Sequence, residues 1–186
     1  MMIRIGLAAL AIAVLGSFAA ACGSDEQSDL TLYLKRDVGN AAPPGQAAPV
    51  LAPVHRLVGG RSRTPAEVLA LLRRGPTSDE LNEGFLPTIP DSVRISNVSE
   101  SDGTVTVDFA GSEPQDFYTH AATVLSLTEL AGIRAVALRS KGQPCCVYNQ
   151  QGNVITPVTR TLYRGWSGEP CALRTYSDAV RCRGEA

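Results

Sequence analysis

The chain has 186 residues, of which 44% are hydrophobic and 19% charged, and its formal net charge is −1. This composition is ordinary for a globular protein, and the length suits one domain with short appendages. The balanced charge predicts no clustered basic surface, so we expect no binding to nucleic acid. The chain has only two histidines, His55 and His120, and neither lies beside a recognisable nucleophile motif. We therefore expect no catalytic residue and no cofactor.

The amino terminus carries the pattern of an export signal. Arg4 precedes an uncharged apolar run from Ile5 to Phe18, which is too short to span a bilayer. The segment Ala19-Ala-Ala-Cys22-Gly-Ser then resembles a bacterial lipobox, although leucine is usual at the place of Ala19. The resemblance implies a signal peptide over residues 1–21, acyl chains on Cys22, a tether over residues 22–29 and attachment to the extracytoplasmic face of the cell membrane. The alternative is ordinary secretory cleavage, which leaves Cys22 as a thiol.

The first part of the domain shows two strand patterns separated by a long polar stretch. Alternating Leu30, Leu32 and Leu34 predict a first strand. Residues 37–53 are rich in alanine, proline and glycine, which predicts a mobile loop. Residues 54–58 predict a second, weakly patterned strand.

A helix is predicted next from its start and stop signals. Thr64 and Glu67 have the spacing of a capping box, with Pro65 at the first helical position. Gly75-Pro76 ends the helix, because glycine adopts the left-handed conformation and proline prevents continuation. The following segment, residues 77–91, reads as a loop with enough apolar residues to pack against the domain.

The segment Val93 to Phe109 predicts a β-hairpin. Asp102-Gly103 favours a two-residue turn, and the residues after it alternate between apolar and polar. Closing that turn pairs Val98 with Val107. One extra residue near Ser96–Asn97 returns the start of the hairpin to its buried face, so we expect a β-bulge there.

A second helix and a last strand complete the predicted domain. The helix follows a capping signal at residues 112–115 and ends at Gly132, and Val136 and Leu138 belong to the last strand. The order is therefore β-β-α-β-β-α-β. It predicts an α+β fold, an antiparallel sheet with two helices packed on one face.

Four blocks carry a resemblance to a known family: Leu69 to Thr77, Ile89-Pro90, Asp102 to Asp108, and Leu127 to Ile133. They resemble the GerMN domain of spore-germination and sporulation proteins of the GerM type and of actinobacterial envelope lipoproteins. The resemblance covers about residues 30–143. It implies a non-enzymatic extracytoplasmic module that acts in assembly or ligand contact at the cell envelope. The chain departs from the family in its long proline- and alanine-rich loop and in a cysteine-bearing tail.

The tail, residues 144–186, holds Cys145, Cys146, Cys171 and Cys182. In an exported protein an even set of thiols predicts disulfides, with three connectivities open. We expect Cys171 and Cys182 each to pair with one member of the Cys145-Cys146 doublet, since a bridge between adjacent residues is unusual. A thiolate metal site is the alternative, but the chain lacks Cys-x-x-Cys and any standard zinc spacing, so no metal is expected.

Other polar residues receive structural interpretations. Asp108 is expected to have a turn or capping role, and Arg73-Arg74 complement the helix macrodipole. Acidic residues in predicted loops read as solvated charges: Glu80, Glu83, Asp91 and Asp102.

Three functions are compatible with this sequence. The first is a lipid-anchored interaction module that contacts other envelope or sporulation proteins. The second is a small-ligand or cell-wall (peptidoglycan) binding module, in which Trp166, Tyr163 and Arg164 contact the ligand, although packed aromatics are the more ordinary reading of this cluster. The third is a hydrolase, which needs one histidine within hydrogen-bond reach of a nucleophile or carboxylate.

Overall fold

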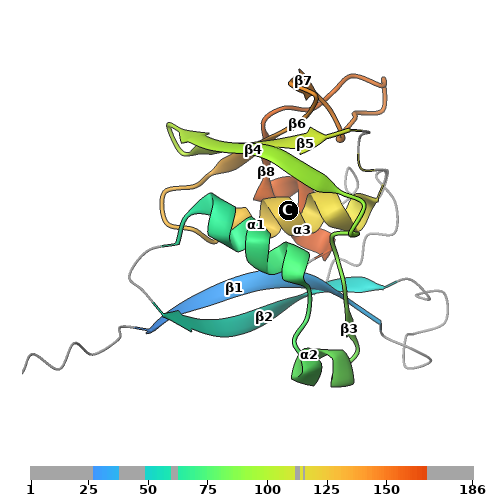
Figure 1. The fold of residues 1–186 in the computed structure, drawn as a ribbon. Coiled ribbons are helices and arrows are strands. Elements are labelled where there is room, and N and C mark those ends of the chain that lie inside the picture. The colour runs from blue at the N-terminus through green and yellow to red at the C-terminus, as the bar shows by residue number, and fades with distance from the viewer. Residues whose placement is uncertain (1–26, 38–48, 60–62, 112–113, 115, 167–186) are drawn as a thin grey trace, which may run out of the picture.

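The computed structural model describes residues 27–37, 49–59, 63–111, 114 and 116–166. Two sheets lie on either side of a helical layer, so the fold belongs to the α+β class (Figure 1). The predicted order of the principal strands and helices is confirmed. The expected sheet, however, is divided into one sheet of three strands and one of five.

The first sheet is built on a long antiparallel pair. Strand β1 (Gln27–Arg36) pairs along its whole length with β2 (Val50–Gly59), and its end also pairs with the short β3 (Phe85–Leu86). Both long strands exceed their predicted bounds. Residues 27–29, expected in the tether, belong to β1, and residues 50–53, expected in the mobile loop, belong to β2. The signal peptide, the rest of the tether and residues 38–48 lie outside the described residues.

On the edge of β1 that faces away from β2, main-chain amides donate hydrogen bonds to side-chain hydroxyl groups. The Tyr33 amide donates to Oγ of Ser126 at 2.9 Å, and the Lys35 amide donates to Oγ1 of Thr88 at 2.8 Å. Both hydroxyl residues are buried. Because unpaired buried amides are costly, these two bonds complete the edge of β1, which β3 covers only at Lys35 and Arg36.

The second sheet contains the predicted hairpin. Strands β4 (Arg94–Ser101) and β5 (Thr104–Ala110) pair with Val98 opposite Val107, and the register shifts between Ile95 and Asn97. The hairpin, its register and the bulge are therefore confirmed. Strand β6 (Ala135–Ser140) lies parallel to β5, and β7 (Gln143–Pro144) and β8 (Val158–Thr159) pair antiparallel with β6.

The first two helices begin with the same capping motif. Helix α1 (Pro65–Arg74) has the predicted capping box between Thr64 and Glu67 and ends at Gly75. Helix α2 (Ser78–Asn82) has a second capping box, between Thr77 and Glu80, in the segment expected to be a loop. The Thr-x-x-Glu spacing is present in the sequence at both places, so the start of α2 was also predictable from the sequence.

Helix α3 (Phe117–Leu127) occupies the middle of the molecule. Asp116 caps its start, not the predicted segment 112–115, and Thr128 caps its end, four residues before the expected Gly132. Every residue from Thr119 to Leu127 is buried, because α3 packs against α1, β1 and β6. A helix buried on all sides requires a layer on each side, which is why one sheet could not suffice.

The apolar core spans both sheets and the helices between them. Its largest fully buried side chains come from β1, β2, α1, β5, α3 and β6: Leu32, Leu34, Leu51, Leu69, Leu72, Val105, Val107, Phe109, Leu125, Leu127 and Leu138. This core fixes the position of β2 and α1, which border the surface hollow described below.

The beginning of the tail packs against the domain. The 3₁₀ helix η2 (Arg160–Trp166) follows β8, and Nη1 of Arg160 lies 2.6 Å from Oε1 of Glu129. The Tyr33 hydroxyl donates to the same carboxylate at 3.0 Å and also accepts from Nη2 of Arg160. These contacts join η2 to β1 and to the segment after α3.

Candidate functional site

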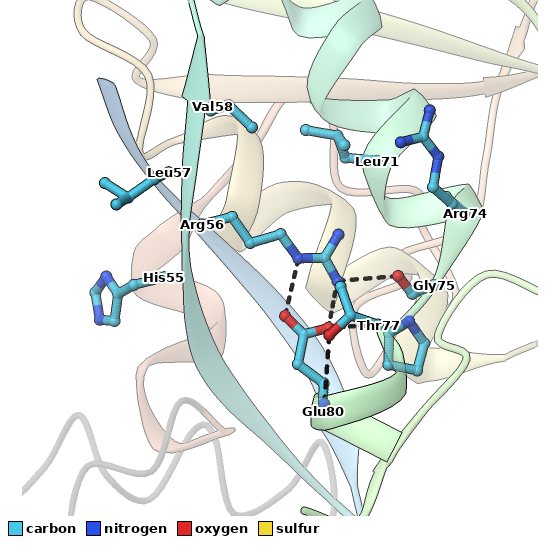
Figure 2. Close-up of a pocket in the computed structure, with 10 residues that line it drawn as sticks. His55, Arg56, Leu57, Val58, Leu71, Arg74, Gly75, Thr77 and Glu80 are labelled. Atoms are coloured by element: carbon cyan, nitrogen blue, oxygen red, sulfur yellow. Dashed lines mark hydrogen bonds and ion pairs between the residues drawn. The ribbon is translucent and has the colours of Figure 1, made fainter. Parts of the chain in front are cut away.

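A surface hollow of about 420 Å³ lies between β2, the end of α1 and the start of α2 (Figure 2). Its strand wall is the run from His55 to Val58, and its helical wall includes Leu71, Arg74 and Glu80. In Figure 2 the side chains of Arg56 and Val58 lie on one side of β2, and those of His55 and Leu57 on the other. Since residues from both faces of β2 border it, the hollow includes the edge of this strand.

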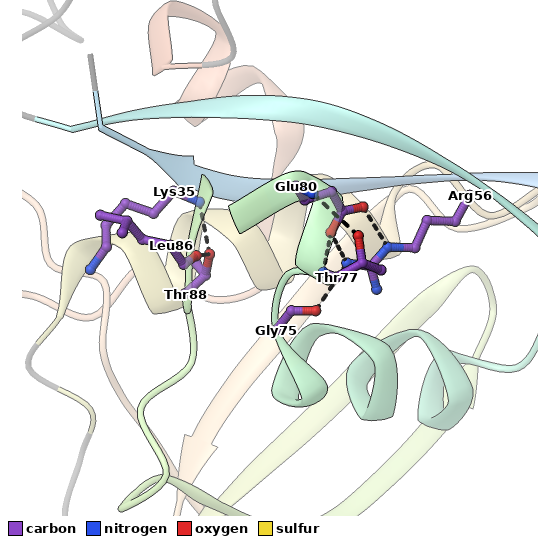
Figure 3. A network of polar contacts seen from close by, with 7 residues as sticks. All are labelled: Lys35, Arg56, Gly75, Thr77, Glu80, Leu86 and Thr88. Atoms are coloured by element: carbon purple, nitrogen blue, oxygen red, sulfur yellow. Dashed lines mark hydrogen bonds and ion pairs between the residues drawn. The ribbon is translucent and has the colours of Figure 1, made fainter. Parts of the chain in front are cut away.

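An ion pair forms the floor of the hollow. Arg56 donates through Nε to Oε1 of Glu80 at 2.9 Å and through Nη2 to Oε2 at 2.5 Å, a bidentate geometry (Figures 2 and 3). Nη2 of Arg56 also donates to the Gly75 carbonyl at 2.9 Å, and the Thr77 amide donates to Glu80 at 2.7 Å. The exposed fractions of the two side chains are only 11% and 14%. The pair therefore fastens β2 to the junction of α1 and α2.

These contacts set the ionisation of Glu80. Burial acts to raise the pKa of this carboxyl, but the hydrogen bonds from Arg56 and from the Thr77 amide outweigh burial and lower it. Glu80 is therefore a charged structural partner, not the solvated loop charge that the sequence suggested. Its oxygens are already engaged by Arg56 and the Thr77 amide, so the carboxylate is not free to take a proton from a bound molecule.

The outward edge of β2 follows from the strand register. The amides of Tyr33 and Lys35 turn away from β2, so odd-numbered residues of β1 are not hydrogen-bonded to their partners on β2. The register pairs odd-numbered residues with odd-numbered residues throughout. The N–H and C=O groups of odd-numbered β2 residues, including His55 and Leu57, therefore point away from β1.

Both ends of this outward edge are protected. Leu51 is fully buried, and Pro53 has no N–H to offer. At the other end, the Gly59 carbonyl accepts a hydrogen bond from the Arg63 guanidinium. The two outward residues between Pro53 and Gly59 remain accessible, and 70% of Leu57 is exposed to solvent.

The two histidines lie on different elements. His55 is exposed on β2, with Nδ1 at 3.3 Å from Oγ1 of Thr31 and at 3.7 Å from a carboxylate oxygen of Asp29. Thr31 and Asp29 therefore both lie beside Nδ1 of His55, on the solvent-exposed face of the sheet. His120 was expected at the surface or half-buried, but it is 5% exposed within α3, because that helix is surrounded. Ser126, in the same helix, accepts the Tyr33 amide described above.

The structure changes the interpretation of the aromatic cluster in the tail. Tyr163 is 2% exposed and its ring lies 5.6 Å from that of Phe117, so it packs in the core and does not offer its ring as a surface contact. The side chains of Arg164 and Trp166 lie outside the described residues, so their contact role stays a prediction.

The cysteines also differ from expectation. A disulfide joins Cys145 to Cys146, where we expected each to pair with Cys171 or Cys182. A bond between adjacent residues closes no long loop, so it does not staple the tail. Cys171, Cys182 and Cys22 lie outside the described residues, and their predicted roles stay predictions.

Asp108 has a structural contact consistent with the turn role expected of it. Its Oδ1 accepts the Gly142 amide at 3.1 Å in the turn after β6. Within the described ranges, no group of three histidine, cysteine or acidic residues is arranged to hold a metal ion. Among the same residues, no helix is long and apolar enough to cross a membrane.

The sequence interpretation missed Arg56 and Glu80. The Thr77–Glu80 capping box was a local signal for Glu80, but nothing in the sequence near Arg56 indicates a partner 24 residues away. Arg74 was interpreted only as a helix-end charge, although it also borders the hollow.

These features define a small α+β domain with an accessible strand edge. The hollow beside this edge is called the groove from here on. The sequence profile of the family described as "Germane: Sporulation and spore germination" matches residues 31–146, and the chain belongs to this family. The predicted GerMN resemblance is therefore confirmed. The family is described by sporulation and germination and not by a reaction.

Solved structures show the same fold. The tandem GerMN domains of the sporulation protein GerM from Bacillus subtilis share 22% identity with a TM-score of 0.54. The alignment covers 72% of this chain but only 46% of that one. The first GerMN domain of the same protein gives 22% identity and a TM-score of 0.51, over 72% of this chain and 98% of that one. No curated protein matches the chain.

Proposed function

We propose that this protein is a non-enzymatic interaction module that acyl chains on Cys22 anchor to the extracytoplasmic face of the cell membrane. The single observation that carries the interaction role is the groove along β2. The Arg56–Glu80 pair occupies the polar floor, so a strand edge with the exposed His55, apolar side chains and Arg74 remain to face a partner. Such a surface suits binding, since Glu80 is already paired and both Thr31 and Asp29 lie against the same ring nitrogen of His55, whereas a catalytic triad uses both nitrogens.

The export pattern supports the location. The family is described by sporulation and spore germination, and a short apolar run with a small-residue segment before Cys22 is typical of exported lipoproteins. On this proposal the partner is another protein of the cell envelope.

Cys22→Ala tests the anchor. The wild-type protein is expected in the membrane fraction, with a mass that includes acyl chains, and the variant is expected to leave that fraction because its lipid attachment is lost. Cys171→Ala is the matched control and should remain with the membrane. Recovery of the Cys22→Ala protein in membranes at the wild-type yield would contradict lipid anchoring.

Affinity capture of the anchored protein from detergent-treated membranes tests the interaction role. We expect the same envelope protein to be recovered in independent preparations and to be missing when an unrelated lipoprotein is the bait. Recovery of no reproducible partner would count against an interaction module.

A further inference from the structure

We propose that the groove binds an extended, acidic segment of a partner protein, which adds as a strand to β2 at His55 and Leu57. This inference rests on the proposed interaction function and names the chemistry of the partner at the groove. Strand addition of this kind draws its affinity from main-chain hydrogen bonds and its specificity from alternate side chains.

The edge of β2 supplies the main-chain groups. His55 and Leu57 each direct an N–H and a C=O away from β1, which makes four groups spaced as an incoming strand requires. Pro53 and the Arg63 side chain block the edge on either side. A long exposed edge would favour unspecific pairing between sheets, whereas this short window admits only a few residues of an extended chain.

The walls of the groove select the side chains of the incoming segment. On one side Val58 and the half-buried Leu71 suit an apolar residue, and on the other side Leu57 is 70% exposed. Arg74 also borders the groove, and no residue in the described part of the chain forms an ion pair with it. Because Glu80 is already neutralised by Arg56, the remaining charge of this wall is positive and complements a carboxylate.

The size of the groove agrees with a short peptide segment. A volume of about 420 Å³ lies within the usual range for ligand sites, roughly 300–1,000 Å³. Leu71 and Arg74 of α1 lie across the hollow from Arg56 and Val58 of β2, so a chain added at the strand edge would lie beside a helical wall (Figure 2). A second copy of this domain would have to bring its own helical layer against the same wall, so a separate extended segment fits better.

Selection from a display library of random nine-residue peptides tests the proposal, with the full chain in detergent as the target. We expect enrichment of peptides in which an aspartate or glutamate alternates with apolar residues. The amides of His55 and Leu57 should become protected from hydrogen exchange when the selected peptide is added. Methylation of the peptide nitrogens that face β2 should weaken binding at least tenfold.

Two variants locate the binding. Arg74→Glu should weaken an acidic peptide at least tenfold and should enrich basic peptides when selection is repeated. Leu57→Pro removes one outward N–H without removing a β1–β2 hydrogen bond, and it should also abolish peptide binding. Arg94→Glu is the control, because it makes the same change of charge at an exposed position on the other sheet, and it should leave peptide binding unchanged.

The outcomes separate the two proposals. No enrichment, or equal binding to the wild type, Arg74→Glu and the methylated peptide, overturns strand addition at this groove. Concentration-dependent dimerisation that Leu57→Pro abolishes, without peptide enrichment, also overturns it in favour of a second copy. If both variants capture the membrane partner at the wild-type yield, the interaction function stands and this docking site is wrong.

Discussion

At the scale of single residues, the Arg56–Glu80 pair holds β2 against the junction of α1 and α2, and it leaves neither charged group free to react. The carboxylate serves both as the capping residue of α2 and as the partner of a strand arginine. Both roles favour its charged form, which is why its pKa is lowered despite burial.

Glu80→Gln should destabilise the fold by about 1–3 kcal/mol at pH 7, between the values typical of exposed and buried ion pairs. Glutamine preserves the volume and the capping geometry, so the loss reports the charge. Since the folded-state pKa lies below the ordinary 4.5, the stabilisation is present above that pH and is lost as pH falls through the folded value. Denaturant unfolding at pH 7 and pH 3 should therefore show the gap between wild type and variant narrowing.

Glu67→Gln is the control for this change, because Glu67 has the same capping geometry at an exposed helix start. It should alter stability less than Glu80→Gln does. An equal effect of the two variants would mean that the ion pair with Arg56 adds nothing.

At the scale of elements, the β4–β5 turn is constrained by what lies beneath it. Gly103 has a φ of +74°, and a Cβ there would lie 2.6 Å from the carbonyl oxygen of Gly132. Gly103→Ala should cost roughly 2–3 kcal/mol, because a left-handed conformation and a backbone clash act together. Gly152→Ala shares the positive φ, at +79°, but its Cβ meets nothing within 4 Å, so thermal denaturation should show about half the loss.

The elements also show what the sequence could reveal. The hairpin register, its bulge and the start of α1 were predictable because each depends on residues close together in the chain: Asp102-Gly103, the shifted alternation near Ser96, and the Thr64–Glu67 spacing. The parallel pairing of β5 with β6 was not, since it depends on how α3 crosses between them. Likewise, the Arg56–Glu80 pair joins segments that no local pattern connects.

At the scale of the whole molecule, α3 determines the architecture. It is buried between two sheets, and its Ser126 hydroxyl completes the edge of β1. With that edge closed by the Ser126 and Thr88 hydroxyls and by the short β3, the long edge of the first sheet that stays open is the one on β2. The position of the groove is thus a consequence of where the central helix packs.

The tail should be held to this body by Arg160. Arg160→Leu removes the bonds to Glu129, Tyr33 and the Leu125 carbonyl, and should cost about 1 kcal/mol, since the pair with Glu129 is partly exposed. Hydrogen exchange should accelerate in η2 and β8 but not in β5. Unchanged exchange in η2 would show that apolar packing, such as that of Tyr163, suffices to hold it.

Site-specific photocrosslinking in the cells that produce the protein tests the interaction account most directly. A photoreactive amino acid replaces Leu57 in one variant and the exposed Leu81 of α2 in another. We predict that position 57 yields one discrete crosslinked envelope protein, that position 81 yields less of it, and that Arg74→Glu reduces the product. The account is contradicted if position 57 yields no discrete product, or the same product at the same yield as position 81.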